Sequence, residues 1–461
     1  MSKRIESDSI GSMELDQDVY YGVQTLRAKL NFPITGRKVC FQFIQNLALI
    51  KKACAITNHE ARLLSEQKKD GIVKAVDEVV FGKLNDQFIT DPIQGGAGTS
   101  LNMNMNEVIA NRANEILGGK KGSYDLVHPN DDVNMAQSTN DVIPTAGRMT
   151  VLTLLQPLFE ELTRLKKALD EKAVEFHSIL KMGRTQLQDA VPMTLGNTFS
   201  SYATMCGRCL ERLNKVKEEM AIVNLGGTAI GSRINASEYY ENHIVGNLSK
   251  LFFRKLSQAD DLFDATENLD SFVEVSGALK AFAVSLSKMC NDLRLLSSGP
   301  RCGFNEINLP AMQNGSSIMP GKVNPVIPEV VSQACFLVIG HDTTITLACE
   351  AGQMELNAFE PVIFDQLFES ISVMTSAIRT LIDHCILGIS ANKDHCLELE
   401  QHSLGIVTAL NPFFGYAKSA HIAKRALKEN RSIEEIVLEE GLMGKDQLEK
   451  ILSKAVTDSE K

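Results

Sequence analysis

The sequence predicts a mainly helical protein whose longest helices lie in the middle of the chain. Between residues 155 and 169, leucines and Phe159 recur at steps of three and four residues, with charged side chains on the opposite face. Between residues 271 and 296, apolar residues repeat about every 3.5 residues, and alanines fill the intervening turns. Strand patterns are scarce, apart from a short candidate pair near residues 10–21. These observations predict a bundle of long helices at the centre of the fold.

The expected elements divide the chain into three domains. Residues 1–136 have shorter elements and more turns, which predicts a mixed, mostly helical N-terminal domain. Residues 137–391 hold the long helices and form the expected central bundle domain. Residues 392–461 mix short helices with a break at Asn411-Pro412, which predicts a small helical C-terminal domain.

The helices expected in the central domain differ in whether they have a polar face. Residues 204–220 follow an amphipathic pattern, and the helix through residues 155–169 is expected to kink at Pro157. The segments 330–356 and 367–389 are long but poor in polar faces. Such helices must be buried inside a bundle or against other subunits. Oligomerisation is the more economical explanation, and a monomeric bundle is the alternative.

Composition limits the partners of the chain. It has 461 residues, of which 44% are hydrophobic and 23% are charged, and its net charge is -10. An acidic surface does not attract nucleic acid or anionic membranes. Residues 1–18 carry charges throughout, and no run of about eighteen apolar residues follows them. We therefore expect a cytoplasmic protein with neither nucleic acid nor membrane as a partner.

The ten cysteines are scattered through apolar segments, which is typical of reduced core thiols. Only Cys206 and Cys209 form a C-x-x-C pair, and they lie within the amphipathic segment 204–220. A metal or redox role would require a second pair of ligands. No metal site is therefore expected.

One polar stretch has chemistry that the helical pattern does not explain. Residues 315–325, GSSIMPGKVNP, place glycine, hydroxyl, cationic and amide groups between prolines. Gly315 and Gly321 allow backbone conformations closed to other residues, while Pro320 and Pro325 limit the freedom of the loop. Hydroxyls and backbone N–H groups can thus be fixed around a carboxylate, although an ordinary turn has a similar composition.

Three further stretches depart from the helical pattern in the same way. Residues 94–102, QGGAGTSLN, form a glycine-rich loop that leads into a helix whose N-terminus favours an anion. Residues 128–141 and 181–189 are rich in amide and hydroxyl groups. Each alone is typical of a turn, but four in one chain indicate a shared small polar ligand. The sequence has no Walker A motif, no dinucleotide-binding fingerprint after a strand and no His/Cys metal cluster.

Together the four stretches resemble the signature regions of the aspartase/fumarase superfamily, with residues 315–325 similar to its mobile signature loop. The similarity extends from residues 20–25, YYGVQT, to Asn411-Pro412, which is nearly the whole chain. It implies a mainly helical, three-domain subunit whose long central helices form the core of a homotetramer. It also implies active sites assembled from three subunits, a small dicarboxylate substrate and no required organic cofactor. Activation by a divalent metal is not indicated either way.

Members of the family eliminate a leaving group to give fumarate or a fumaryl product. The proton they remove is barely acidic, and its loss produces an enediolate-like carboxylate that fixed hydrogen-bond donors must stabilise. Ser316 matches the catalytic serine base, which is plausible if loop N–H groups and Lys322 hold its oxyanion. Lys322 and Asn324 also match groups that bind the α-carboxylate together with Thr185. The positions that match groups around the other carboxylate and the leaving amine are Thr99, Ser138, Thr139, Asn140 and Ser317.

Gln186 separates the two branches of the family. Fumarases carry histidine at this position, where it helps to handle water, and a neutral amide can hydrogen-bond an amine but cannot relay a proton. Residues 188–193, 326–330 and 352–361 also resemble aspartases more closely. The resemblance therefore implies reversible deamination of L-aspartate to fumarate and ammonia, with Gln186 in the catalytic set. Some aspartases keep histidine there, so hydration of fumarate to L-malate is the alternative.

Two positions raise separate questions. Ser232-Arg233 follows residues 225–231 where the family usually has Thr-Gly, and the cation either alters substrate fit or faces solvent. His128 matches a residue of a peripheral dicarboxylate site in fumarases and is interpreted here as capping chemistry. A non-catalytic scaffold with this fold is the rival class, and the presence of both Ser316 and Lys322 argues against it.

Overall fold

The computed structural model describes residues 2–448 and 450–451, which divide into two compact units. Their ranges interleave along the chain: Met1–Phe159, Glu211–Ala283 and Phe336–Thr375 for unit 1, and Glu160–Leu210, Val284–Cys335 and Ser376–Lys461 for unit 2. The division crosses the five longest described helices, so each unit contains a segment of every one. The expected division into three domains at 136/137 and 391/392 stays a prediction.

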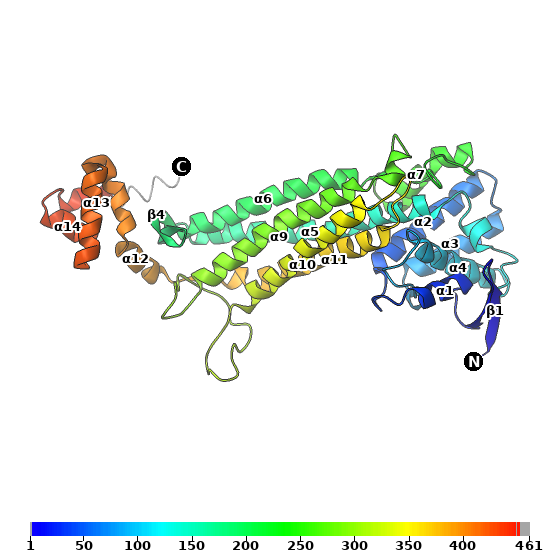
Figure 1. The fold of residues 1–461 in the computed structure, drawn as a ribbon, viewed down its shortest axis with the longest axis horizontal. Helices are drawn as coiled ribbons and strands as arrows, with labels where there is room; N and C mark the ends of the chain where they lie inside the picture. Colours follow the sequence, from blue (N-terminus) through cyan, green and yellow to red (C-terminus); the bar gives the residue numbers. More distant parts are fainter. Residues whose placement is uncertain (1, 449, 452–461) are drawn as a thin grey trace. The chain divides into compact units, whose positions relative to one another are not determined.

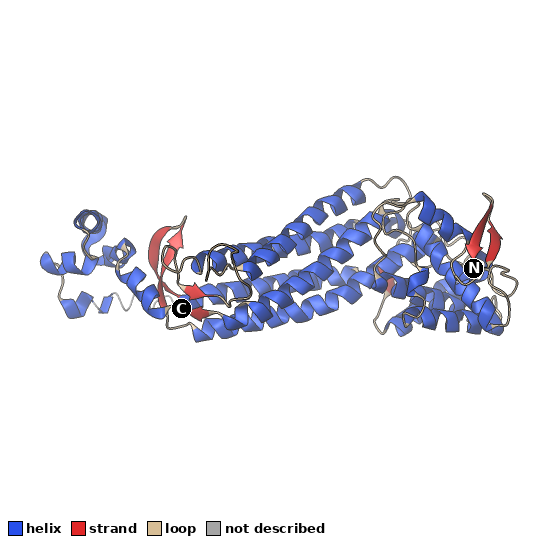
Figure 2. Ribbon diagram, turned by 90° about the horizontal axis from the view of Figure 1, so that it is seen from below, coloured by secondary structure: helices blue, strands red, loops and turns tan. Residues whose placement is uncertain are grey.

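Five long helices confirm the predicted mainly helical fold, and their segments run alongside one another within each unit (Figures 1 and 2). They are α5 (Thr139–Glu175), α6 (Leu195–Glu219), α9 (Asp270–Leu296), α10 (Val326–Glu350) and α11 (Glu360–His384). Leucines at three- and four-residue steps account for α5, since Leu155, Leu158, Leu162 and Leu165 are fully buried. The helix continues through Pro157, where the sequence predicts a kink.

Two helix boundaries differ from the sequence prediction. The apolar segment expected to reach residue 356 ends as a helix at Glu350, and α11 begins at Glu360 rather than at residue 367. A tight turn lies between them, with Gln353 paired to Leu356 and Met354 in the left-handed region at φ 55°. The amide of Asn357 caps the end of α10 by donating to the carbonyls of residues 348 and 349.

Unit 1 also contains the elements of the N-terminal part of the chain. Its remaining helices are α1 (Val23–Asn31), α2 (Phe41–Glu60), α3 (Glu66–Val80), α4 (Thr99–Ile116), α7 (Glu238–Phe252) and α8 (Asp264–Glu267), with short helical turns at Asn85–Gln87 and Pro129–Val133. Helix α2 packs against α3 and α7, and α3 packs against α4. Leu47, Ile50, Ile72, Met105 and Ile109 are fully buried and form the centre of this packing.

Short strands complete unit 1. The candidate pair near residues 10–21 is an antiparallel hairpin, although its first strand lies earlier than expected: β1 (Lys3–Ser7) pairs with β2 (Ser12–Asp16). A two-residue parallel pair joins β5 (Ile222–Val223) to β6 (Ser257–Gln258).

Unit 2 contains a hairpin that the sequence analysis reads as a polar loop. Strand β3 (Leu180–Thr185) pairs antiparallel with β4 (Gln188–Thr194), with an irregularity next to Gly183. A Cβ on Gly183 would lie 2.8 Å from the carbonyl oxygen of Val191, so only glycine allows the strands to approach there. The sequence does not predict the hairpin because its strand residues next to the turn, Arg184 and Thr185 on one side and Gln188 and Asp189 on the other, are all polar and lack period-two alternation.

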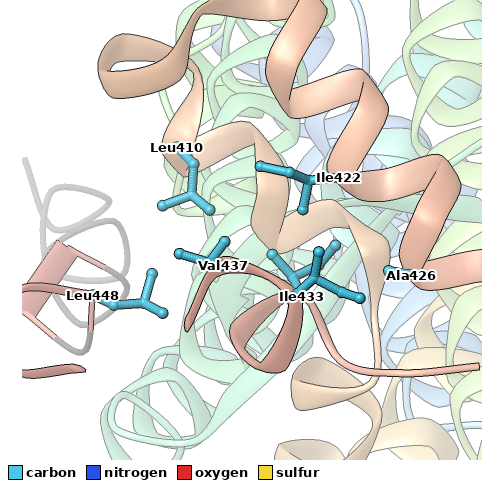
Figure 3. Close-up of a cluster of buried hydrophobic side chains, with 7 residues drawn as sticks. Leu410, Ile422, Ala426, Ile433, Val437 and Leu448 are labelled. Carbon is cyan, nitrogen blue, oxygen red and sulfur yellow. The ribbon is translucent and has the colours of Figure 1, made fainter. Parts of the chain in front are cut away.

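The C-terminal helices have their own apolar core (Figure 3). The elements are β7 (Ile307–Asn308) paired with β8 (Ser390–Ala391), turns at Ile386–Gly388 and Leu404–Leu410, and helices α12 (Lys393–Gln401), α13 (Asn411–Glu429) and α14 (Ile433–Glu439). The buried members of the core are Leu410, Ile422, Ala426, Ile433, Ile436, Val437 and Leu448. The predicted break at Asn411-Pro412 is confirmed as a boundary between two helical elements: the turn Leu404–Leu410 ends there and α13 begins, with Pro412 in its first turn, where the missing N–H costs nothing.

Candidate active site

The signature loop is closed at its neck by its own backbone and by one side chain. The N–H of Gly315 donates to the carbonyl of Lys322 at 2.9 Å, and the amide Nδ2 of Asn324 donates to the carbonyl of Gly315 at 2.8 Å. A Cβ on Gly315 would lie 2.6 Å from that Lys322 oxygen, so a larger residue would open the neck. The loop residues 315–324 are thereby held as one unit.

Ser316 lies inside this loop with its hydroxyl oxygen facing backbone donors. Its Oγ accepts hydrogen bonds from the N–H groups of Ile318 at 3.2 Å and Met319 at 3.0 Å. Two N–H groups aimed at one oxygen stabilise negative charge on it, as they do in an oxyanion hole. This arrangement supplies the loop N–H groups that a serine base requires.

Two other polar residues of the loop are exposed. Lys322 and Ser317 are exposed, and among the described residues no hydrogen bond or ion pair occupies the Lys322 ammonium. Apolar side chains on the same loop are exposed as well, including Ile318 at 84% and Val323 at 51%. An unpaired cation on the same loop as Ser316 provides positive charge for an anionic ligand.

Thr185 and Gln186 occupy the tip of the β3–β4 hairpin. Gln186 and Leu187 form its two-residue turn with φ values of 53° and 65°, both in the left-handed region that favours glycine. Such a conformation costs roughly 1–3 kcal/mol per non-glycine residue and is concentrated at functional sites. Thr185 and Gln186 are both exposed, and among the described residues no hydrogen bond or ion pair joins them to the signature loop.

Strand β3 of the hairpin is anchored by a buried carboxylate. Glu306 is fully buried and pairs with Arg184 at 2.6 Å and with Lys181 at 3.1 Å. The Arg184 guanidinium also lies over the ring of Phe304, 4.3 Å from its centroid. The strained turn that carries Gln186 therefore extends from a fixed support.

In unit 1 the glycine-rich loop positions Thr99 at the first turn of α4. Gly98 is the N-cap residue with φ 87°, and a Cβ there would lie 2.9 Å from Cγ2 of Ile143. The Thr99 hydroxyl donates to the carbonyl of Gly96 at 2.7 Å. One turn later, the amide of Asn102 donates to the hydroxyl oxygen of Thr139 at 3.2 Å and joins this loop to residues 138–140.

Residues 138–140 precede or begin α5, and their side chains are half-buried. The Oγ of Ser138 accepts the N–H of Asn140 at 3.2 Å, and the Asn140 amide donates to the carbonyl of Ala229 at 2.7 Å. Ser138, Thr139 and Asn140 thus form one cluster in unit 1, and Asn102 links it to the helix that begins at Thr99. The candidates Thr185, Gln186, Ser316, Ser317, Lys322 and Asn324 belong to unit 2.

Asp141 holds this cluster together, a role that the sequence analysis did not assign. Its carboxylate is fully buried and accepts the N–H groups of Ser138 at 2.9 Å, Gly226 at 3.0 Å and Thr228 at 3.1 Å. Burial raises the pKa of Asp141 to about 6, against the effect of these hydrogen bonds. Its position two residues after Thr139 and directly before the apolar face of α5 is the signal of an N-terminal cap.

The structure also answers the two questions about unusual positions. Arg233 has φ 61°, where the family's glycine would be unstrained, and its guanidinium makes long contacts of 3.5 Å to Glu241 and Gln258 at the surface. The Nδ1 of His128 accepts the N–H of Asp131 at 3.2 Å, which confirms the capping interpretation. Among the described residues, no group of three His, Cys, Asp or Glu side chains is arranged to hold a metal ion.

Comparison with known proteins adds independent information. A family model described as a lyase matches residues 11–340, and one described as the fumarase C C-terminus matches residues 406–456. Aspartate ammonia-lyase of Helicobacter pylori (strain J99) is 53% identical over 97% of this chain and 96% of that protein. Aspartate ammonia-lyases of Bacillus subtilis and Escherichia coli K12 are each 48% identical over 98% of this chain and 95% of their own length.

Solved structures show the same similarity. The fumarate lyase:delta crystallin from Brucella melitensis bound to cobalt superposes with a TM-score of 0.95 at 47% identity, covering 98% of this chain and 99% of that chain. The recombinant class II fumarase from Schistosoma mansoni superposes with a TM-score of 0.95 at 33% identity, covering 98% of each chain.

Proposed function

This chain belongs to the lyase family that contains the aspartases and fumarases, and from that membership we infer how its side chains convert L-aspartate to fumarate and ammonia. The reaction is a reversible carbon–nitrogen elimination, and the aspartate ammonia-lyases match this chain over nearly its whole length. The substrate is a small dicarboxylate.

We propose that Ser316 removes the proton from C3 of L-aspartate. The observation that carries this proposal is the pair of N–H groups, from Ile318 and Met319, that point at its Oγ. A serine oxyanion is too basic to persist in water, and donors fixed before the reaction lower the cost of forming it. The Lys322 ammonium on the same loop adds positive charge.

Loss of the proton places a second negative charge on the carboxylate next to C3. The donors that we assign to this carboxylate and to the leaving amine are Thr99, Ser138, Thr139, Asn140 and Ser317. Lys322, Asn324 and Thr185 bind the α-carboxylate in this assignment. Gln186 hydrogen-bonds the amine, because a neutral amide has both donor and acceptor groups but no proton to relay.

We further propose that the chain works as a homotetramer. Helix α10 has a stretch with mean hydropathy 1.3 of which only 33% is buried within the chain, which by length and composition alone would also suit a membrane span. Its exposed apolar side chains include Phe336 at 59% and Leu347 at 63%. Polar contacts on other faces, such as buried Asp342 with half-exposed Lys280 at 2.6 Å, orient the helix within the chain. Covering the apolar face with other subunits accounts for it without a membrane.

Sharing of active sites between three subunits follows from the same proposal. Among the described residues the cation of Lys322 has no hydrogen-bond or ion-pair partner, and Ile318 and Val323 on the same loop are exposed. In a tetramer the signature loop can close over residues supplied by other subunits and exclude water. We also propose the cytoplasm as the location, since all ten cysteines are free and seven of them are buried.

The test of this function is a direct assay of the purified protein. L-Aspartate should give fumarate, followed by its ultraviolet absorbance, and fumarate with ammonia should give the reverse reaction. L-Malate supplied under the same conditions distinguishes the alternative. Turnover of L-malate without turnover of L-aspartate would contradict the assignment, and absence of both reactions would favour a scaffold role.

A further inference from the structure

Lys51 is a buried cation in unit 1 that the assigned chemistry does not use. It lies on α2, and its side chain is fully buried. Its Nζ donates to the amide oxygens of Asn102 at 2.7 Å, Gln137 at 2.8 Å and Asn134 at 2.9 Å. All three acceptors are neutral, and among the described residues no carboxylate forms an ion pair with Lys51. A buried charge that is balanced only by amides is expensive, so its presence calls for a specific role.

The three contacts match the donors of an ammonium group. An ammonium group has three hydrogens and satisfies three acceptors, whereas a neutral amine has two hydrogens and a lone pair that would face the third oxygen. Burial lowers the pKa of Lys51 to about 7, while the charges of Cys54 and Asp141 act in the opposite direction. The other ionisable group near this cluster is Tyr240 on α7, which is fully buried and contacts Cys54 at 3.1 Å.

The ammonium determines the orientation of the Asn102 amide. Because Lys51 can only donate, Asn102 must turn its oxygen toward Lys51. The nitrogen of the same amide then faces Oγ1 of Thr139 at 3.2 Å and Oδ1 of Asn134 at 3.2 Å. Thr139 is an acceptor in its bond with Asn102, so the hydrogen of its hydroxyl is directed elsewhere. A carboxylate has only acceptors and needs such a hydrogen.

We propose that Lys51 is a positioning residue for substrate binding, which acts through Asn102 to leave the Thr139 hydroxyl free to donate to a carboxylate of the substrate. The inference rests on the proposed function, because it requires that Thr139 contacts a dicarboxylate. Lys51 itself does not touch the substrate. Its charge also adds positive potential two hydrogen bonds away from that carboxylate.

The decisive variant is Asn102→Asp. The new side chain keeps the size of asparagine and gives Lys51 a counter-charge, so the buried cation is better balanced than before. It replaces the Nδ2 donor by an acceptor, and Thr139 must then donate its hydrogen to residue 102. We expect the KM for L-aspartate to rise at least tenfold with a smaller change in kcat, and the inhibition constant of succinate to rise in parallel.

A double-mutant cycle with Thr139→Val identifies the route of the effect. If Lys51 and Asn102 act through the Thr139 hydroxyl, Asn102→Asp should add little to a protein that already lacks it. Asn106→Asp is the matched control, because Asn106 also donates to Asn134 at 3.2 Å but does not contact Thr139. Its effect on KM should be additive with Thr139→Val.

Lys51→Met tests whether Lys51 is what orients the Asn102 amide, and Lys52→Met is its control. Lys52 follows Lys51 on α2 but pairs with Asp77 at the surface at 2.5 Å. Lys51→Met should raise KM as Asn102→Asp does, and Lys52→Met should leave it unchanged. If Asn102→Asp does not fold, the cycle is run with Lys51→Gln and Thr139→Val, with the same expectation.

The outcomes separate this inference from the function on which it rests. Wild-type protein that fails to deaminate L-aspartate would refute the proposed function and this inference with it. Active wild-type protein with an unchanged KM in Asn102→Asp, or with additive effects in the cycle, would overturn the role of Lys51 alone. A raised KM without additivity supports it.

Discussion

The guanidinium of Arg184 donates a 2.6 Å hydrogen bond to the fully buried carboxylate of Glu306 and so anchors strand β3 close to the hairpin turn of Gln186 and Leu187. The turn is exposed and its two residues are strained, whereas Arg184 and Lys181 on the preceding strand are ion-paired with Glu306. The geometry of the strained turn therefore depends on an ion pair formed by a residue two positions before Gln186.

Glu306→Gln should destabilise the protein and impair catalysis together. The substitution leaves the buried cations of Arg184 and Lys181 without a counter-charge, which costs about 3–5 kcal/mol for a buried pair. Chemical unfolding measures the loss, and steady-state kinetics should show lower kcat/KM. Glu398→Gln is the control, since that carboxylate is exposed and contacts only His395. Equal denaturant midpoints of unfolding for Glu306→Gln and Glu398→Gln would contradict the anchoring role of Glu306.

Ser316→Ala should remove the proposed base while leaving the fold intact. General-base catalysis contributes about 10²–10⁴-fold, so kcat should fall by at least that factor. Ser317→Ala is the comparison within the same loop, because no backbone N–H of the described chain donates to its hydroxyl; it should raise KM more than it lowers kcat. Near-normal kcat in Ser316→Ala would exclude this serine as the base.

Gly98→Ala should displace Thr99. The left-handed backbone costs an L-residue about 1–2 kcal/mol, and the new methyl would lie 2.9 Å from Ile143. Gly118→Ala isolates the backbone cost, because Gly118 has nearly the same φ of 86° and no atom within 4 Å of its added Cβ. The difference between the two unfolding free energies measures the contact with Ile143. If Gly118→Ala raised KM as much as Gly98→Ala does, displacement of Thr99 would not be the cause of the rise.

Stability should rise with pH above neutrality because of Lys51. Its folded pKa of about 7 lies below the ordinary lysine pKa of 10.5, so the cost of burying the charge is fully present below pH 7. Between these values the folded state releases the proton and the unfolded state keeps it, which raises the free energy of unfolding by up to about 1.4 kcal/mol per pH unit. The measurement is the difference between wild type and Lys51→Met at each pH. A constant difference from pH 7 to 10 would contradict it.

Asp141 should make stability fall as pH rises, in a lower pH range than that of Lys51. Its folded pKa of about 6 lies above the ordinary aspartate pKa of 3.8, so its contribution to stability is present below pH 3.8 and is lost as pH rises through 6. Comparison of wild type with Asp141→Asn between pH 4 and 7 should show the wild type losing stability relative to the variant. The two windows do not overlap and can be measured separately.

Phe336→Glu should dissociate the proposed tetramer. Phe336 is 59% exposed on the apolar face of α10, and a carboxylate there would be buried by assembly without a partner. Light scattering should show smaller species, and activity should fall because active sites are shared. Leu427→Glu is the control, since Leu427 is 72% exposed on α13 outside that helix. A Phe336→Glu protein that remains tetrameric and active would place the interface elsewhere.

Much of the fold could be predicted from local patterns. The leucine spacing in α5 and the 3.5-residue repeat in α9 predict long helices because side chains on one face of a helix must be buried together. The β3–β4 hairpin could not be predicted in this way. Its polar strand residues do not alternate, and its turn of Gln186 and Leu187 lacks the Asn-Gly signal.

The candidate site, like the fold, could be predicted from the sequence only in part. The chemical character of the signature loop, with Ser316 and Lys322 between glycines and prolines, is visible in eleven consecutive residues. Lys51 is hidden because it lies in an ordinary apolar helix, where only its position three residues before buried Cys54 and four after buried Leu47 marks it as inward-facing. A lysine at such a position is a signal that a buried polar network exists, but not of its partners.

The sequence by itself determined the helical class, the loop chemistry and the likeness to a family of lyases, because these depend on residues that are near one another along the chain. Only the tertiary structure decided which polar groups form hydrogen bonds with one another. Three features depend on how donors and acceptors are oriented. They are the two N–H groups that face Ser316, the carboxylate of Asp141 that accepts the N–H of Ser138, and the link from Lys51 through Asn102 to Thr139. A hydrogen bond requires donor and acceptor to face each other within about 3 Å, and residues far apart in sequence meet that condition only when the chain has folded.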